Sequence, residues 1–184
     1  MDIITTKDNQ FTFKLKISES LANSIRRYIN EVPVLAVDEV EISRNDSPLY
    51  DETLAHRIGL MPLIMEKVGA TPKFKLEVKR EGYVYSGDFS PKKVVYDKIP
   101  LTLLSKGQEI ELTTTTILGK GSEHSKFSPG FMFYRESENP EEEKESDELV
   151  LVAESFGQMP VKNMLLGSID ALKKDLNFVS KKLK

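Results

Sequence analysis

The sequence predicts an α+β fold in which strands and two amphipathic helices form a main domain that receives a small β-rich insert. Three observations carry this prediction. Residues 20–33 repeat apolar side chains at helical spacing, residues 165–183 repeat them with a heptad period, and residues 69–134 contain short alternating or β-branched runs separated by turns. We expect the main domain to comprise residues 1–66 and 149–184, and the insert to comprise residues 67–148.

The first strand and the first helix are predicted near the start of the chain. Residues 11–17 alternate apolar and polar side chains, as a half-buried strand does. In residues 20–32 the apolar positions i, i+4, i+7, i+8 and i+11 share one helix face; they are Leu21, Ile25, Tyr28, Ile29 and Val32. Ser18 or Ser20 can cap this helix, and Pro33 ends it because the residue before a proline avoids helical geometry.

A second strand and a short helix precede the insert. Residues 34–42 place Val40 and Ile42 on one face and glutamates on the other, which is typical of a strand. After a turn-rich connection, Asp51 caps a short helix that extends to Met61 and is closed by a glycine and a proline.

The insert is predicted to be rich in β-strands and to end in an acidic loop. Strands are expected at residues 74–79, 94–96, 101–104 and 110–118. Residues 136–148 hold eight acidic residues and one lysine, which favours a solvated loop. The formal net charge is −3, but without this run the chain has 25 basic and 21 acidic residues. That mild excess is far from the strongly basic surface of a dedicated nucleic-acid-binding protein.

The last strand and the last helix complete the main domain. Residues 149–156 are predicted to form a strand, and a helix is expected from about Pro160 to Lys182. Its apolar residues are spaced 4, 3, 4, 3 and 4 apart and form a heptad seam; they are Leu165, Ile169, Leu172, Leu176, Val179 and Leu183. The seam spans fewer than three heptads, which is short for an independent coiled coil.

The two apolar stripes must be covered by something. Burial of one Leu, Ile or Val side chain contributes roughly 1.5–3 kcal/mol, so the two stripes together represent more than about 10 kcal/mol. Two arrangements satisfy them. Either both helices pack on their own strands as ordinary core, or part of each helix packs against another chain. Periodicity alone does not decide between these arrangements.

The sequence contains no convincing catalytic set. The chain has no cysteine, which excludes disulfides, iron–sulfur clusters and thiolate zinc sites within it. Its two histidines, His56 and His124, lack metal-ligand spacing and have no nucleophile elbow beside them, so we interpret both as structural. No apolar run of about 18 residues is present, so we expect no membrane span, and the first residues lack a signal-peptide pattern. The absence of cysteine fits an intracellular protein.

Three blocks of sequence carry a family resemblance. The first block runs from Leu21-Ala-Asn-Ser-Ile-Arg-Arg-Tyr-Ile through Glu31-Val-Pro33 to residues 36–42. The second block is residues 51–63, with the sequence Asp-Glu-Thr-Leu-Ala-His-Arg-Ile-Gly-Leu-Met-Pro-Leu. The third block is the loop at residues 119–129. Together they resemble the α-like subunits of cellular RNA polymerases, most nearly the archaeal D-type subunits. The similarity extends to the third-largest subunit of the eukaryotic nuclear enzymes and, more distantly, to bacterial α.

The resemblance implies that the first and last helices form a dimer surface. The partner would be the small α-like subunit of L type. The residues expected at that interface are Leu21, Ile25, Arg26, Arg27, Tyr28, Ile29, Leu165, Ile169, Leu172, Leu176 and Val179. Arg26 and Arg27 match the paired arginines of the family, and one or both would reach the second-largest subunit. Further contacts with the large subunits are expected at His56, Arg57, His124, Lys126 and Phe127.

The resemblance also implies a role without catalysis in this chain. It points to an assembly subunit of a DNA-directed RNA polymerase, a nucleotidyltransferase whose catalytic residues lie in other subunits. The largest and second-largest subunits and the small N- and P-type subunits would be its partners, DNA would be met only through the holoenzyme, and the location would be the cytoplasm of an archaeal-type cell. We expect no cofactor. Two alternatives stay open: a homodimeric α-like scaffold, and a stand-alone hydrolase that uses His124.

Overall fold

The computed structural model describes residues 2–7, 9–65, 71–136 and 148–183. Strands and helices are mixed along the chain, which confirms the predicted α+β class. The chain divides into two compact units. The terminal unit contains Met1–Pro33 and Lys120–Lys184, and the central unit contains Val34–Gly119.

The terminal unit is built on a four-stranded antiparallel sheet with the strand order β1-β2-β9-β8. The strands are β1 (Asp2–Thr6), β2 (Gln10–Lys16), β8 (Gly130–Glu136) and β9 (Glu148–Ser155). Phe13 lies opposite Leu151, and Met132 lies opposite Ala153. Cross-strand partners point to the same side of a sheet, and all four of these residues are buried. They form the inner face of the sheet.

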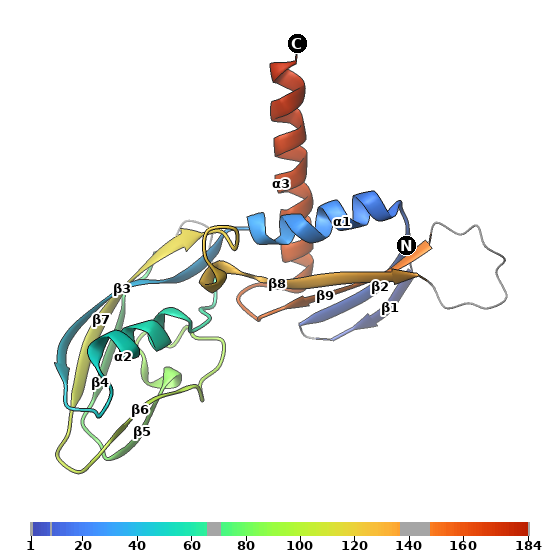
Figure 1. Ribbon diagram of the computed structural model, residues 1–184. Coiled ribbons are helices and arrows are strands. Elements are labelled where there is room, and N and C mark those ends of the chain that lie inside the picture. Colours follow the sequence, from blue (N-terminus) through green and yellow to red (C-terminus); the bar gives the residue numbers. More distant parts are fainter. Residues whose placement is uncertain (1, 8, 66–70, 137–147, 184) are drawn as a thin grey trace. The chain divides into compact units, whose positions relative to one another are not determined.

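The helices of the terminal unit pack on this inner face (Figure 1). They are α1 (Glu19–Tyr28), the short 3-10 helix η1 (Ile29–Glu31) and α3 (Val161–Lys182). The Lys162 ammonium of α3 lies 5.4 Å from the centre of the Phe11 ring on β2. A Cβ atom at Gly130 on β8 would lie 2.8 Å from the Met164 sulfur, so the glycine allows α3 to approach that strand closely.

The ends of α1 follow from its sequence. The Ser18 hydroxyl oxygen accepts a hydrogen bond from the Leu21 amide at 3.3 Å, which confirms one of the two predicted caps. The single predicted helix changes to 3-10 geometry at Ile29, and Val32 has an extended backbone immediately before Pro33.

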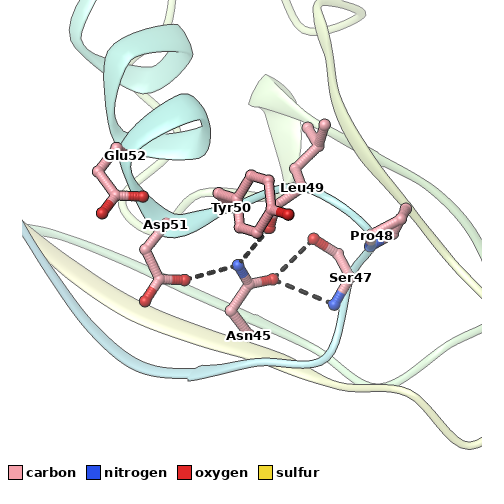
Figure 2. A pocket seen from close by; sticks show the side chains of 7 residues that line it. All are labelled: Asn45, Ser47, Pro48, Leu49, Tyr50, Asp51 and Glu52. Carbon is pink, nitrogen blue, oxygen red and sulfur yellow. Dashed lines mark hydrogen bonds between the residues drawn. The ribbon is translucent and has the colours of Figure 1, made fainter.

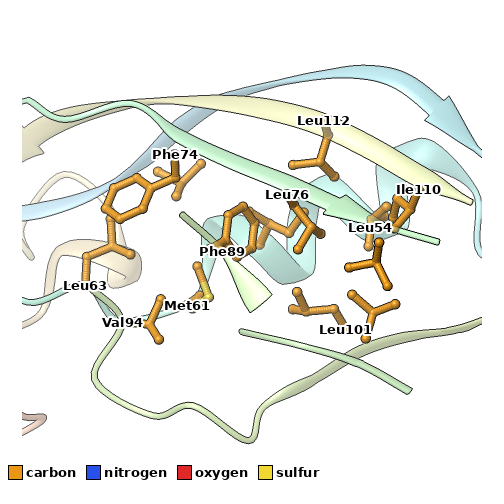
Figure 3. Packing of buried hydrophobic residues seen from close by; sticks show 14 of the residues in the cluster. Leu54, Met61, Leu63, Phe74, Leu76, Phe89, Val94, Leu101, Ile110 and Leu112 are labelled. Atoms are coloured by element: carbon orange, nitrogen blue, oxygen red, sulfur yellow. The ribbon is translucent and has the colours of Figure 1, made fainter. Parts of the chain in front are cut away.

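The central unit contains a three-stranded antiparallel sheet in the order β3-β7-β4 and a separate two-stranded sheet. Its elements are β3 (Val34–Asn45), α2 (Asp51–Gly59), β4 (Phe74–Val78), β5 (Gly82–Tyr85), the 3-10 helix η2 (Ser86–Asp88), β6 (Pro100–Leu104) and β7 (Ile110–Gly119). Leu54 of α2, Leu76 of β4 and Leu112 of β7 are fully buried in its hydrophobic core, together with Leu101 of β6 (Figure 3).

This division differs from the predicted one. The predicted boundaries lie at residues 66/67 and 148/149, whereas the compact units meet at 33/34 and 119/120. The reason is strand pairing: β3 pairs along its length with β7 and carries α2 into the same core, while β8 pairs with β9 of the terminal sheet. Alternation within a strand reveals its two faces but not its partner. Of the predicted acidic loop, residues 137–147 lie outside the described residues.

One predicted strand is replaced by irregular structure. Residues 94–96 contribute only an isolated bridge, between Val94 and Leu63. Val94 is buried in the core of the central unit, so its apolar character reflects packing of a loop rather than a strand.

Candidate subunit interface

The apolar stripe of α1 is divided between the core and the surface. Ile29 and Val32 are buried within the terminal unit, whereas Leu21 is 44% exposed, and Ile25 and Tyr28 are half-buried. The sequence did not single out Ala22, which is the fully buried residue of α1. Its distance of seven residues from Ile29 places both on one helix face, and that spacing was the available signal.

The heptad seam of α3 is likewise covered only at its beginning. Leu165 is 8% exposed and lies in the core, and Ile169 and Leu172 are half-buried. Beyond them, Leu176 is 61% exposed, Val179 53% and Leu183 83%. All residues from Lys173 to Leu183 are exposed, and Figure 1 shows α3 continuing past α1 as a single helix. We call residues 172–183 the distal seam segment. The first half of α3 therefore packs on its own unit, as one of the two arrangements expects, whereas the distal seam segment is not covered by the described part of the chain.

Contacts between α1, η1 and α3 fix how the two apolar surfaces adjoin. The Tyr28 hydroxyl donates to an Asp175 carboxylate oxygen at 3.1 Å, and this hydrogen bond raises the pKa of Tyr28. Closer to the sheet, a Cβ at Gly167 would lie 3.2 Å from a Val32 methyl carbon, so α3 and the end of η1 are in close contact. The exposed side of α1 and the distal seam segment thus belong to one surface held by the same unit.

Arg26 and Arg27 lie in the last turn of α1 and are both exposed. Positive charge is favourable there because the C-terminal end of a helix carries partial negative charge. The Arg26 guanidinium donates two hydrogen bonds to the Asn23 side-chain oxygen, at 3.1 and 2.9 Å. The Arg26 side chain is therefore held along the helix surface.

The loop at residues 120–129 is tied to the end of η1. Lys120 and Glu31 form an ion pair at 2.9 Å, and the Ser122 amide donates to the Asn30 carbonyl at 3.2 Å. The hydrogen bond from Lys120 lowers the pKa of the Glu31 carboxyl, and Glu31 in turn raises the pKa of Lys120. These contacts hold the two points at which the chain passes into and out of the central unit.

Within this loop the predicted contact residues differ in accessibility. His124 is exposed, and its Nδ1 accepts a hydrogen bond from the Lys126 amide at 3.0 Å. Phe127, in the 3-10 helix η3 (Ser125–Phe127), is 6% exposed. Phe127 is thus a core residue of its own unit and not an available contact, because its ring is already covered. The Lys126 ammonium lies 4.9 Å from the centre of that ring.

His56 and Arg57 lie on α2 in the central unit. Both are exposed, and the Arg57 guanidinium donates a hydrogen bond to the Pro100 carbonyl oxygen. They therefore belong to a different compact unit from α1 and α3, and we treat them as a separate surface.

The loop before α2 borders a shallow depression of about 400 Å³ (Figure 2). Asn45 organises this loop: its amide nitrogen donates to the Leu49 carbonyl and to Asp51, and its oxygen accepts from the Ser47 amide and hydroxyl. The polar atoms of Asn45 are therefore engaged in shaping the turn. The depression is lined by Asn45, Ser47, Pro48, Leu49, Tyr50, Asp51 and Glu52, none of which is an activated nucleophile or base.

The described part of the chain shows no arrangement of side chains that is typical of a catalytic site. No hydrogen bond joins His124 to Ser122 or Ser125 there, and no group of three or more His, Cys, Asp or Glu residues is placed to hold a metal ion. In the same residues no helix is both long enough and apolar enough to cross a membrane. What this surface offers instead is apolar area beside charged side chains.

Comparison with known proteins gives a consistent result. Residues 5–176 match the family described as RNA polymerase Rpb3/Rpb11 dimerisation domain. The chain is 38% identical to DNA-directed RNA polymerase subunit Rpo3 of Pyrococcus furiosus over 73% of its length, and spans 58% of that relative. It is 34% identical to the Rpo3 of Methanocaldococcus jannaschii over 89% of its length, and spans 85% of that relative.

Proposed function

Because the chain belongs to the RNA polymerase Rpb3/Rpb11 dimerisation-domain family, we propose that it is a non-catalytic assembly subunit of a multisubunit DNA-dependent RNA polymerase. It pairs with a small α-like subunit of L type through α1 and α3, and the resulting pair docks the two large subunits. The chain contributes to nucleotidyl transfer only as part of that complex.

The single observation that carries this proposal is the distal seam segment. A helix whose apolar heptad positions face water loses the free energy that burial would provide, roughly 1.5–3 kcal/mol for each Leu or Val. Leu176, Val179 and Leu183 are each more than half exposed in the isolated chain. A second amphipathic helix laid along them would bury these side chains as knobs between its own residues.

The buried first half of α3 holds the exposed distal seam segment in position for a partner. Val161, Met164, Leu165 and Ser168 are buried in the terminal unit and anchor the helix on its sheet. The helix is therefore formed and oriented before any partner arrives. A pre-formed surface loses less conformational entropy on binding than a segment that must fold at the same time.

The charged residues beside these helices are proposed to contact the larger subunits. Arg26 and Arg27 offer guanidinium groups, which form directional pairs with carboxylates. His124 and Lys126 offer a second polar surface on the terminal unit, and His56 with Arg57 a third on the central unit. The small N- and P-type subunits remain proposed partners, and DNA is met only through the assembled enzyme.

Co-expression with an L-type subunit from the same cell tests the proposal. The two chains should co-purify as a one-to-one complex whose mass is read by light scattering. Replacing Leu176 and Val179 together by glutamate should abolish the complex, because two charges would be buried without partners. The matched control replaces Asn177 and Lys181 by glutamate, at positions of the same helix turns that face away from the seam and its flanks, and should retain it.

Two results would refute the proposal. One is a wild-type chain that stays monomeric in the presence of the L-type subunit at low salt. The other is a complex that survives the Leu176 and Val179 replacements as well as it survives the control replacements. A homodimer of the isolated chain that excludes the L-type subunit would favour the homodimeric scaffold instead.

A further inference from the structure

The distal seam segment carries positive charge that the chain does not neutralise. Within it, Lys173, Lys174, Lys181 and Lys182 are all exposed. None of the four lies within ion-pair distance of a carboxylate in the described residues. The Lys182 ammonium instead lies 5.7 Å from the centre of the Phe178 ring, which is itself exposed.

Some exposed cations elsewhere in the chain do form ion pairs with carboxylates. On the central unit, Arg44, Lys75 and Lys79 each pair with carboxylates that lie on β4 or β7 or next to the ends of β3 and β7. We call this set the surface ion-pair ladder; its pairs are Arg44–Asp46, Arg44–Glu109, Lys75–Glu77, Lys75–Glu111, Lys79–Glu77 and Lys79–Glu109. Lys16, Lys73 and Lys106 are also exposed without an ion pair among the described residues, so what distinguishes the distal seam segment is that its unpaired lysines lie beside an apolar seam.

Helix geometry separates the four lysines into two pairs. The seam residues Leu172, Leu176 and Val179 occupy the a and d positions of the heptad. Lys173 follows a d residue and Lys182 precedes an a residue, so they are at the e and g positions that flank the seam on opposite sides. Lys174 and Lys181 project from the back of the helix. In coiled helices the e and g charges set partner choice, whereas charges at the back face solvent.

The acidic residue on the same flank is already engaged. Asp175 also occupies a g position, but its carboxylate accepts the Tyr28 hydroxyl at 3.1 Å and holds α1 against α3. A second copy of this chain would bring the same lysines to the seam, and its Asp175 would have to leave Tyr28 in order to pair with them. An acidic partner helix would meet both flanking lysines without this cost.

We propose that Lys173 and Lys182 select the partner of this surface by charge. The partner helix presents Asp or Glu beside its own apolar seam, facing these two lysines, and self-association of the chain is disfavoured in comparison. This inference rests on the proposed function, since it concerns the partner that covers the distal seam segment.

Two charge-reversal variants on the same helix test the idea. The flank variant is K173E/K182E, and the back variant is K174E/K181E. Both change the net charge equally, in exposed positions of one helix, so neither should alter folding as judged by circular dichroism. The probe is the L-type subunit from the same cell, with affinity measured by isothermal titration at about 50 mM and about 500 mM NaCl.

The flank variant should bind the L-type subunit at least about tenfold more weakly than wild type at low salt, because each attraction becomes a repulsion. The back variant should lose no more than about threefold, and the difference between the two should shrink at high salt. In addition, wild type mixed with the flank variant should associate more tightly than either chain with itself.

The possible outcomes separate the two claims. If wild type binds the L-type subunit but the flank and back variants are equally affected or equally unaffected, charge selection is wrong and the assembly role stands. If wild type associates with itself as tightly as it binds the L-type subunit at low salt, charge selection is also wrong. If wild type does not bind the L-type subunit under any salt condition, the assembly role itself fails.

Discussion

Two leucines of one heptad seam should affect different properties when replaced by alanine, one mainly the folding stability of the chain and the other mainly the binding of a partner. Leu165 is 8% exposed and Leu176 is 61% exposed, although both occupy seam positions of α3. Leu165→Ala removes a side chain from a packed core and should lower the free energy of unfolding of the isolated chain by about 2–5 kcal/mol. Leu176→Ala should lower it by less than about 1 kcal/mol, because most of that side chain is already in water.

When binding of the partner is measured instead of unfolding, Leu176→Ala should have the larger effect of the two replacements. The exposed 61% of Leu176 becomes buried only when a partner helix covers it, which is worth about 1–2 kcal/mol. Leu176→Ala should therefore raise the Kd for the L-type subunit by about 5- to 30-fold. Urea unfolding followed by circular dichroism gives the first quantity, and isothermal titration gives the second. Asn177→Ala, on the adjacent polar position, should change neither quantity measurably.

Either of two results would refute this reasoning. If Leu176→Ala destabilises the isolated chain as strongly as Leu165→Ala, the distal seam segment is covered within the chain itself. If Leu176→Ala leaves both unfolding and binding at wild-type values, the distal seam segment is not the partner surface.

Three further results are expected. Gly130→Ala should destabilise the chain by about 3 kcal/mol or more in urea unfolding, since a Cβ there would lie 2.1 Å from a backbone carbonyl oxygen of β9, whereas Gly59→Ala, which meets no atom within 4 Å, should be neutral or slightly stabilising. Lys120→Met should raise the pKa of Glu31, which NMR titration would follow, because the hydrogen bond from Lys120 lowers that pKa. The stabilisation that this pairing gives the folded chain is present above the ordinary Glu pKa near 4.5 and disappears as the pH falls through the lowered pKa of Glu31. The variant should therefore lose less folding stability on acidification than wild type. Lys75→Met, which removes two pairs of the surface ion-pair ladder, should lower the unfolding midpoint slightly at low salt and leave it unchanged at about 1 M NaCl.

The sequence predicted the elements better than their partners. The first helix, its Ser18 cap and the end before Pro33 depend on local side chains, and the structure agrees with all three. The long-range pairing of β3 with β7 depends on which strand offers a complementary face, and alternation within β3 carries no such information. The predicted domain boundaries therefore differ from the compact units.

For the candidate surface, too, the sequence predicted which residues share a face but not what covers that face. Periodicity placed Leu165 and Leu176 in one seam but could not say that the core covers the first and not the second. That difference depends on where the sheet beneath α3 ends, which is a property of the assembled unit. Phe127 illustrates the converse: family resemblance suggested a contact residue, whereas the packing of its loop buries the ring.

The strand order β1-β2-β9-β8 has a consequence for the timing of synthesis. The central unit is one continuous stretch and can be completed while later residues are still being made, since domains fold as units during translation. The inner face of β2, with Phe11 and Phe13, has to wait for β9 and α3, which are translated long afterwards. The proposed partner surface, which combines α1 with the distal seam segment of α3, can therefore be complete only after the whole central unit has been made.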